Sequence, residues 1–413
     1  MTRPDAPAPL RRRGPRPLLL HLTLAMLRST VSRATSPTSK PGWPTSSTAF
    51  TEAATVIAAA LRDPEHAGSA AEALFSREVV DETLRQDAAL ISGIAAYRRH
   101  PHARDLADPP ALWAEGESRL LDYGGQGVPV LFVPSLVNRA YVLDLAPGHS
   151  MLRFLAGQGV RPLLLDWGWP GEVERRFTLT DYVAGRMERA TAAAVAAAGG
   201  PVVLAGYCMG GTLAVAAAER RPDLLRGLVL LAAPWDFHAD DRPRAEALAR
   251  ALPLFEPAMA FNGTLPIDLL QVLFALLDPW AVADKYRAFA RLDPDGPRAR
   301  LFVALEDWLN DGVPLAAPVA RECLAGWYGE NTPAAGTWRI AGQTVSPRAI
   351  TLPSFVAVPA RDRIVPPESA RPLARLIPGA VLHEPQAGHI GMAAGGTAER
   401  VLWTPLRDWL RAL

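Results

Sequence analysis

The feature that most constrains this chain is a strand, a tight turn and a helix that follow one another around Cys208. Residues 202–207 are apolar or small and predict a buried strand. Glycines surround the cysteine in the pattern Gly-x-Cys-x-Gly-Gly, and an alanine-rich helix is expected over residues 212–219. Small residues let the two backbones pass close together, and the residue at the apex is held with a strained, positive φ.

A cysteine at such an apex has two interpretations. A thiolate at the start of a helix is favoured by unpaired backbone N–H groups and by the helix dipole, which would make Cys208 a nucleophile. The alternative is a buried structural cysteine in an ordinary glycine-rich turn. Strand, turn and helix occur in the order that a nucleophile of this kind requires, so we favour the first interpretation.

Composition limits the classes of function. The chain of 413 residues is long enough for one large α/β domain with an appendage. Its formal net charge of +1 gives no reason to expect nucleic acid as a partner. Its two cysteines are Cys208 and Cys323, and their contexts predict free thiols in a reducing compartment.

The first part of the chain differs from the rest. Residues 1–49 are expected to form a basic amphipathic helix and a linker, the linker being the Ser-, Thr- and Pro-rich stretch 36–47. Arginines precede the apolar run 18–27, which superficially resembles a signal peptide. The run contains His21, lacks a clear cleavage site and is too short to span a bilayer. We therefore expect a helix that lies on a surface or docks on the main domain.

The remainder divides into a helical segment over residues 50–115 and an α/β domain over residues 116–413. Short apolar runs that alternate with helical patterns predict a mostly parallel sheet with helices on both faces. The expected strands are 130–134, 161–166, 202–207, 227–232, 355–358 and 381–384, and the expected helices include 150–158, 181–198 and 403–413. Between about residues 236 and 338 the alternation stops, and an apolar, aromatic, helical stretch predicts a cap insertion over the site.

Two further polar residues follow predicted strands. Asp362 comes just after the strand 355–358, and His389 lies in a glycine-flanked loop after the strand 381–384. Each has an ordinary interpretation alone, the aspartate as a turn carboxylate that caps a helix and the histidine as a surface residue. The carboxyl ends of parallel strands share one edge, so we expect these side chains near Cys208 as an acid and a base.

The order nucleophile, acid, histidine is that of the α/β-hydrolase fold. With Gly-Tyr-Cys-Met-Gly-Gly at the elbow, the chain resembles the polyhydroxyalkanoate (poly-3-hydroxybutyrate) synthases, in which cysteine replaces the serine of lipases. The resemblance covers roughly residues 131–392 and is closest to the catalytic subunit of the two-component (class III) enzymes. The motifs that carry it are 136–145, 165–170, 179–182, 234–237, Asp362 with 364–366, and 388–392.

The resemblance implies an acyltransferase. Cys208 would attack the thioester of an (R)-3-hydroxyacyl-CoA, and His389 would serve as its base. Asp362 would orient the histidine or help to activate the hydroxyl of the next monomer. Backbone N–H groups of Met209 and of Leu136 or Val137 would hold the oxyanion, worth on the order of 3 kcal/mol per donor. No phosphate loop and no metal-ligand spacing occur in the sequence, so we expect no metal and no cofactor; coenzyme A is part of the substrate.

Partners and location follow from the same resemblance. It implies a homodimer in the cytoplasm at polyhydroxyalkanoate granules, in contact with the growing polyester and its surface. A second synthase subunit is implied by the two-component enzymes, yet roughly the first hundred residues have no counterpart in their short subunit. Met209 also stands where those enzymes usually have glutamine.

Two rival functions remain open at this point. A thioesterase or an intracellular polyhydroxyalkanoate depolymerase would use the same triad and differ only in the fate of the acyl group. The apolar cap favours the synthase, because polymerisation requires a site that excludes water. A non-catalytic granule-associated protein would have lost a member of the triad, and all three residues are present.

Overall fold

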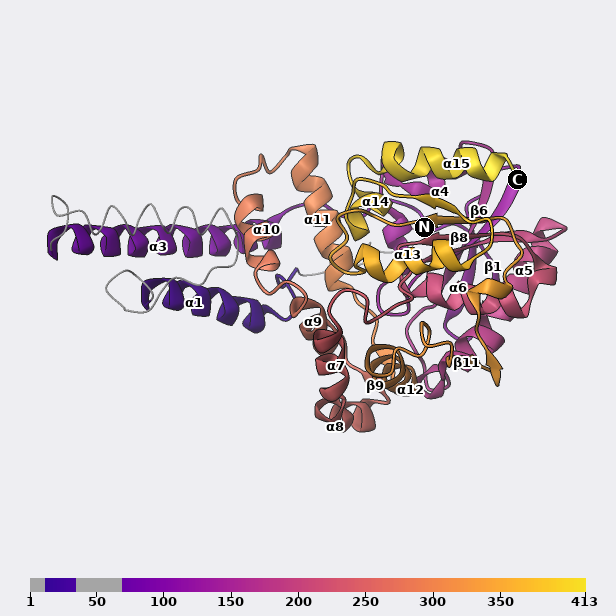
Figure 1. The fold of residues 1–413 in the computed structure, drawn as a ribbon. Coiled ribbons are helices and arrows are strands. Elements are labelled where there is room, and N and C mark those ends of the chain that lie inside the picture. The colour runs from indigo at the N-terminus through magenta and orange to yellow at the C-terminus, as the bar shows by residue number, and fades with distance from the viewer. Residues whose placement is uncertain (1–11, 35–68) are drawn as a thin grey trace. The chain divides into compact units, whose positions relative to one another are not determined.

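The computed structural model describes residues 12–34 and 69–413 (Figure 1). By their internal contacts these residues form two compact units. The first contains the described residues up to Pro101 together with Asp278–Val303, and the second contains His102–Leu277 and Ala304–Leu413. The predicted boundaries at residues 49 and 115 stay predictions, and the stretches 36–47 and 50–68 lie outside the described residues.

The second unit is built on an eight-stranded sheet in the order β1-β2-β6-β3-β7-β8-β13-β14. All neighbouring pairs from β6 to β14 are parallel, whereas β1–β2 and β2–β6 are antiparallel. The mostly parallel sheet is therefore confirmed. The strands are β1 (Ala111–Glu115), β2 (Ser118–Asp122), β3 (Val128–Val133), β6 (Val160–Asp166), β7 (Val202–Tyr207), β8 (Leu225–Leu231), β13 (Ser354–Ala357) and β14 (Val381–His383).

Helices cover both faces of this sheet, as predicted. The helices α4 and α15 lie on one side and α5 and α6 on the other (Figure 1). The central strands β7 and β8 are buried nearly throughout, which explains their continuous apolar sequence. The covering helices are α4 (Met151–Ala156), α5 (Glu188–Ala198), α6 (Met209–Arg220), α13 (Pro367–Leu376) and α15 (Thr404–Arg411), and a π-helical turn η3 (Asp181–Met187) precedes α5.

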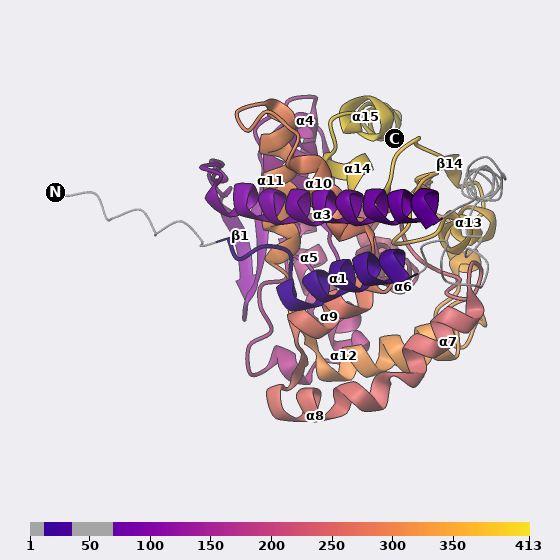
Figure 2. The same ribbon diagram turned by 90° about the vertical axis from the view of Figure 1, so that its left-hand side faces the viewer.

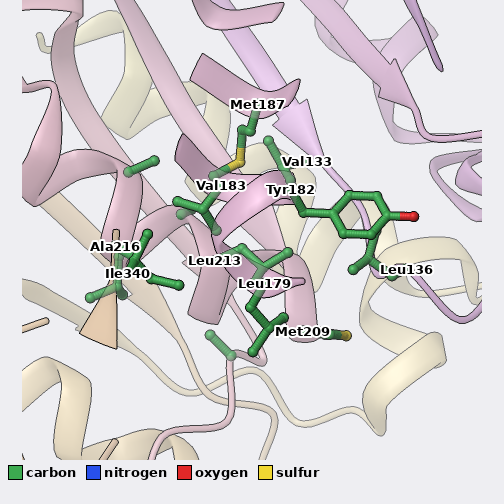
Figure 3. Close-up of a cluster of buried hydrophobic side chains, with 14 of the residues drawn as sticks. Val133, Leu136, Leu179, Tyr182, Val183, Met187, Met209, Leu213, Ala216 and Ile340 are labelled. Carbon is green, nitrogen blue, oxygen red and sulfur yellow. The ribbon is translucent and has the colours of Figure 1, made fainter. Parts of the chain in front are cut away.

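The main core lies between the sheet and α6. Figure 3 shows side chains from η3, from α6 and from the loop after β3 gathered in one cluster, and all of them are buried. Met209, the residue after the cysteine, belongs to this cluster, so packing fixes the start of α6. The labelled members include Leu136, Leu179, Val183, Met209 and Leu213.

The insertion predicted over residues 236–338 is mainly helical. In the second unit it supplies α7 (Arg242–Arg250), α8 (Leu252–Asn262), α9 (Ile267–Ala275), α12 (Ala317–Arg321) and the π-helical turn η5 (Glu322–Gly329). A short antiparallel pair, β9 (Thr264–Leu265) with β10 (Leu315–Ala316), joins its two halves. Residues Asp278–Val303 belong instead to the first unit.

The first unit is helical. It contains α1 (Leu18–Ala34), α3 (Ser69–Arg99), α10 (Ala281–Phe289) and the beginning of α11 (Pro297–Asn310). Helices α1 and α3 lie side by side in both views (Figure 2). Their core is aromatic, with Tyr97 edge-on to Tyr286 at 5.6 Å between ring centroids. The helix predicted around residues 18–27 is confirmed, and within the described ranges no helix has the length and apolar character to cross a bilayer.

Candidate active site

Cys208 lies at the apex between β7 and α6, as predicted. Its backbone has φ 55° and ψ −131°, a strained conformation for a residue with a side chain. Its N–H donates to the carbonyl of Leu231 at 2.8 Å, which fixes the turn to the neighbouring strand. A Cβ on Gly206 would meet the Cα of Gly211 at 2.4 Å, and one on Gly210 would meet the carbonyl oxygen of Val133 at 2.2 Å. The glycines are therefore required by the close approach of strand and helix.

Asp362 follows β13, on the same edge of the sheet. Its side chain is fully buried. One carboxylate oxygen, Oδ1, accepts hydrogen bonds from the N–H groups of Ile364 and Val365 at 2.8 and 2.9 Å. The other, Oδ2, lies 2.6 Å from Nδ1 of His389. The carboxylate is thus held by its own loop and aimed at the histidine.

His389 is the first residue of α14 (His389–Ala394), so it lies at a helix start and not in a loop as expected. Because the Asp362 carboxylate can only accept, Nδ1 carries the proton and Nε2 is left for the cysteine. Burial opposes protonation of the ring, but the charge of Asp362 and the electrostatic interaction with Cys208, with hydrogen bonds to both side chains, raise the pKa of His389 to about 10. The predicted aspartate, histidine and cysteine are therefore brought together.

Tyr207 also belongs to this arrangement, and sequence reasoning gave it no role. Its ring packs against the imidazole of His389 with 5.1 Å between centroids. Its hydroxyl donates to the backbone carbonyl of His389 at 3.3 Å, and burial first, then the charges of Cys208 and Asp362, raise the pKa of this hydroxyl well above its ordinary value. Its position just before the nucleophile was the available signal.

The predicted oxyanion donors differ in their surroundings. Met209 and Val137 border the cavity that contains Cys208. The N–H of Val137 donates to Oγ of Ser135, which also borders the cavity, at 3.4 Å. Leu136 is 4% exposed and packs into the core. The backbone of Met209 at the start of α6 and the loop after β3 therefore flank the cysteine from two sides.

The cysteine opens into a cavity of about 210 Å³. The apolar part of its wall comes from the inserted helices α7 and α9 and the turn η5, and includes Leu248, Leu270, Leu273, Phe274 and Trp327. Charged side chains occupy another part of the wall, namely Asp236, Asp240, Asp241, Arg244 and Arg363. Cys323 borders the same cavity, and burial raises the pKa of its thiol well above the ordinary value. The two thiols therefore border one cavity.

Within residues 12–34 and 69–413 no group of His, Cys, Asp or Glu side chains could hold a metal ion. Both cysteines are free thiols. The geometry, with a thiol, an imidazole and a buried carboxylate in sequence, suits covalent acyl transfer.

Comparisons with known proteins agree with this geometry. Residues 130–401 match the Alpha/beta hydrolase family. The chain is 31% identical to the poly(3-hydroxyalkanoate) polymerase subunit PhaC of Haloferax mediterranei over 72% of this chain and 62% of that one. It is 30% identical to the protein of the same name from Allochromatium vinosum, over 69% of this chain and 81% of that one. It is also 30% identical to the protein of that name from Synechocystis sp., over 68% of this chain and 77% of that one.

Proposed function

The chain belongs to the poly(3-hydroxyalkanoate) polymerase family of the α/β-hydrolases, a family of acyltransferases, and we propose that it polymerises (R)-3-hydroxyacyl groups from coenzyme A through an acyl-enzyme on Cys208. The observation that carries this proposal is a cysteine on a strained elbow that opens into a largely apolar cavity, with a histidine held behind it by a buried aspartate.

The first step loads the enzyme. Sγ of Cys208 attacks the thioester carbonyl carbon, the bond from that carbon to the sulfur of coenzyme A breaks, and the proton held by His389 passes to the leaving thiolate. The backbone N–H of Met209, with that of Leu136 or Val137, holds the developing oxyanion in this proposal, and each well-placed donor is worth about 3 kcal/mol. The N–H of Val137 would first have to leave Oγ of Ser135. The raised pKa of His389 keeps the imidazolium charged for this proton transfer.

The second step extends the chain. The 3-hydroxyl oxygen of the acceptor attacks the carbonyl carbon of the acyl-cysteine, its proton moves to Nε2 of His389, and the Cys208 thiolate leaves. Asp362 is a positioning residue in both steps. Its side chain is fully buried and both of its oxygens are already occupied by backbone N–H groups and by His389. This favours orientation of the histidine over direct activation of the acceptor hydroxyl.

In the second step the acceptor hydroxyl, and not water, must attack the acyl-cysteine. The walls from α7, α9 and η5 are mainly apolar, and a dry chamber lowers the local concentration of water while it strengthens the electrostatic interactions inside. We propose that this chamber separates the polymerase from thioesterases and depolymerases with the same triad. The reaction as proposed uses no cofactor.

The partners of the proposed enzyme are the acyl-CoA substrate, the growing polyester and the surface of the granule that forms. The relatives are named as subunits, which supports a second synthase subunit. We propose a homodimer that works at the granule in the cytoplasm, with the second subunit as a further component.

Loading of the enzyme tests the proposal. Purified protein is incubated with (R)-3-hydroxybutyryl-CoA carrying a label in its acyl group, and label bound to protein, coenzyme A and acyl product are measured. Cys208→Ala should bind no label and release no coenzyme A. Cys323→Ala is the matched control, because it removes the other thiol that borders the same cavity, and it should load like the wild type.

The fate of the acyl group separates the rival functions. Insoluble polyester supports the polymerase. Free 3-hydroxybutyrate would identify a thioesterase and overturn the proposal. Unchanged turnover in Cys208→Ala would remove the cysteine from the mechanism.

A further inference from the structure

The outer side of α1 carries an apolar stripe that is exposed in the part of the chain that the structure describes. Ala25 and Ser29 on the inner side are buried against the rest of the first unit. Leu19 and Met26 are 79% and 68% exposed, and Leu27 and Val31 are about half exposed. These positions recur at the spacing of one helix face, so the exposure is a continuous stripe and not scattered residues.

An apolar hollow adjoins the stripe. It has a volume of about 420 Å³ and lies between α1 and α3, with Leu18 and Leu22 on one wall and Ile91 and Ile94 on the other. Figure 2 shows the two helices running side by side. Arg98 and Arg99, in the last turn of α3, form part of its lining. A second hollow shares Leu18 and Arg98 with the first and adds Arg12 and Arg13.

The segment that carries the stripe is basic, although α3 beside it contains acidic side chains such as Glu82 and Asp87. Residues 12–34 contain five arginines (12, 13, 16, 28 and 33) and no aspartate or glutamate. Arg28 pairs with Asp284 at 3.0 Å and lies over the ring of Trp280, which is itself 38% exposed. Arg33 bonds to the hydroxyl of Thr83. A basic helix with an exposed apolar stripe and a nearby tryptophan has the features of segments that lie in a lipid interface.

We propose that α1 and the hollow beside it form a docking surface for a layer of anionic phospholipid. The stripe enters the acyl region, the hollow accepts a chain, and the arginines contact the phosphates. A neutral polyester surface would give the arginines no partner. A second copy of the chain would place like charges against each other. The surface lies in the first unit, so it is independent of the acyl-transfer proposal.

Vesicle flotation with the full chain tests the proposal. The probe is vesicles of phosphatidylcholine with about 30% phosphatidylglycerol, compared with phosphatidylcholine alone. The wild type should float with the anionic vesicles, and added salt should reduce the bound fraction. Leu19→Ser with Met26→Ser should reduce it about tenfold or more. Arg98→Gln with Arg99→Gln should weaken anionic binding and leave folding unchanged.

Leu254→Ser with Phe261→Ser provides the matched control. These residues of α8 are as exposed, 78% and 89%, but they lie outside the arginine-rich segment. The control should float like the wild type, and all variants should retain the secondary structure and melting temperature of the wild type. The proposal is overturned if the wild type does not float with the anionic vesicles or if the stripe variant, Leu19→Ser with Met26→Ser, floats like the wild type. It is equally overturned if the bound fraction of the α8 control falls as much as that of the stripe variant. It is also overturned if the stripe variant splits a dimer in size-exclusion chromatography, since the stripe would then join two copies.

Discussion

Asp144 and Asp362, both in the second unit, have side chains that are wholly buried and fully hydrogen-bonded, yet their hydrogen-bond partners differ in kind. Asp144, in β4 (Asp144–Ala146), accepts from Arg153 at 2.7 and 3.0 Å, from Arg104 at 3.0 Å and from the hydroxyl of Tyr123 at 3.2 Å. Asp362 accepts from two backbone N–H groups and from one imidazole. The difference lies in the partners and not in the burial.

The partners decide what each carboxylate can contribute. An arginine keeps its proton under all physiological conditions, so the cluster around Asp144 is a fixed set of charges that ties β4 to α4 and to the segments that contain Arg104 and Tyr123. An imidazole can gain and lose a proton, and His389 also reaches Cys208. Burial and full hydrogen bonding therefore do not identify a working carboxylate, whereas a titratable partner next to a nucleophile does.

The largest effect is expected for His389→Gln. Without the base, loading of Cys208 should slow by about 10⁵-fold, because members of such a triad act as a unit. Glutamine can still donate to Asp362 but cannot carry the charge of the imidazole, so the free energy of unfolding in urea should fall, and the rate is therefore compared per folded molecule. The measurement is single-turnover release of coenzyme A. Asp144→Asn is the comparison, and an equal loss of rate there would show that the two carboxylates are not distinct.

Asp362→Asn should follow, with a loss of about 10⁴-fold in the same assay. The amide cannot hold the histidine in the tautomer that presents Nε2 to the cysteine. Its hydrogen bonds from Ile364 and Val365 can persist through the side-chain oxygen, so the fold should survive. A rate near that of the wild type would mean that the histidine is positioned by Tyr207 and its own helix alone.

The pH dependence sharpens this second prediction. Since the folded pKa of His389 is raised to about 10, its charge stabilises the protein fully below the ordinary histidine pKa, and that contribution is lost as pH rises through about 10. In Asp362→Asn the imidazole should titrate at lower pH than in the wild type. NMR titration of the imidazole, assigned by comparison with His389→Gln, measures its pKa in the wild type and in Asp362→Asn. Titration of the wild type at an ordinary histidine pKa would contradict the coupling.

The sequence predicts a region well where each of its residues can be placed from its own neighbours in the chain. It predicts a region poorly where residues distant in sequence must first be brought together. Cys208 and Asp362 each follow a buried strand, and His389 follows the exposed strand β14. Parallel strands bring such positions to one edge, so the site was predictable. The hairpin of β1 and β2 was not, because β1 is short and largely exposed and lacks a clear alternation. The Asp144 cluster was also missed, since its partners at 104, 123 and 153 are far apart in sequence.

Asp144→Asn should mainly affect stability. It leaves two arginines next to a neutral amide, and breaking a buried ion pair costs about 3–5 kcal/mol. The free energy of unfolding in urea should fall by that amount, while the rate of Cys208 loading per folded molecule stays near that of the wild type. A stability loss below about 1 kcal/mol would show that the half-exposed Arg153 and the partly exposed Arg104 are solvated well enough to do without their partner.

Tyr207→Phe should produce the smallest effect, and Tyr123→Phe is its matched control. Each change removes one hydroxyl, which bonds to the carbonyl of His389 at 3.3 Å in the first case and to Asp144 at 3.2 Å in the second. Each should lower the free energy of unfolding by about 1 kcal/mol. Only Tyr207→Phe should also slow loading, by about threefold to tenfold, because the ring contact with the imidazole remains but the backbone of His389 is held less firmly. If both variants slowed loading equally, the cluster around Asp144 would have to act on the triad, and the two buried carboxylates would belong to one functional network.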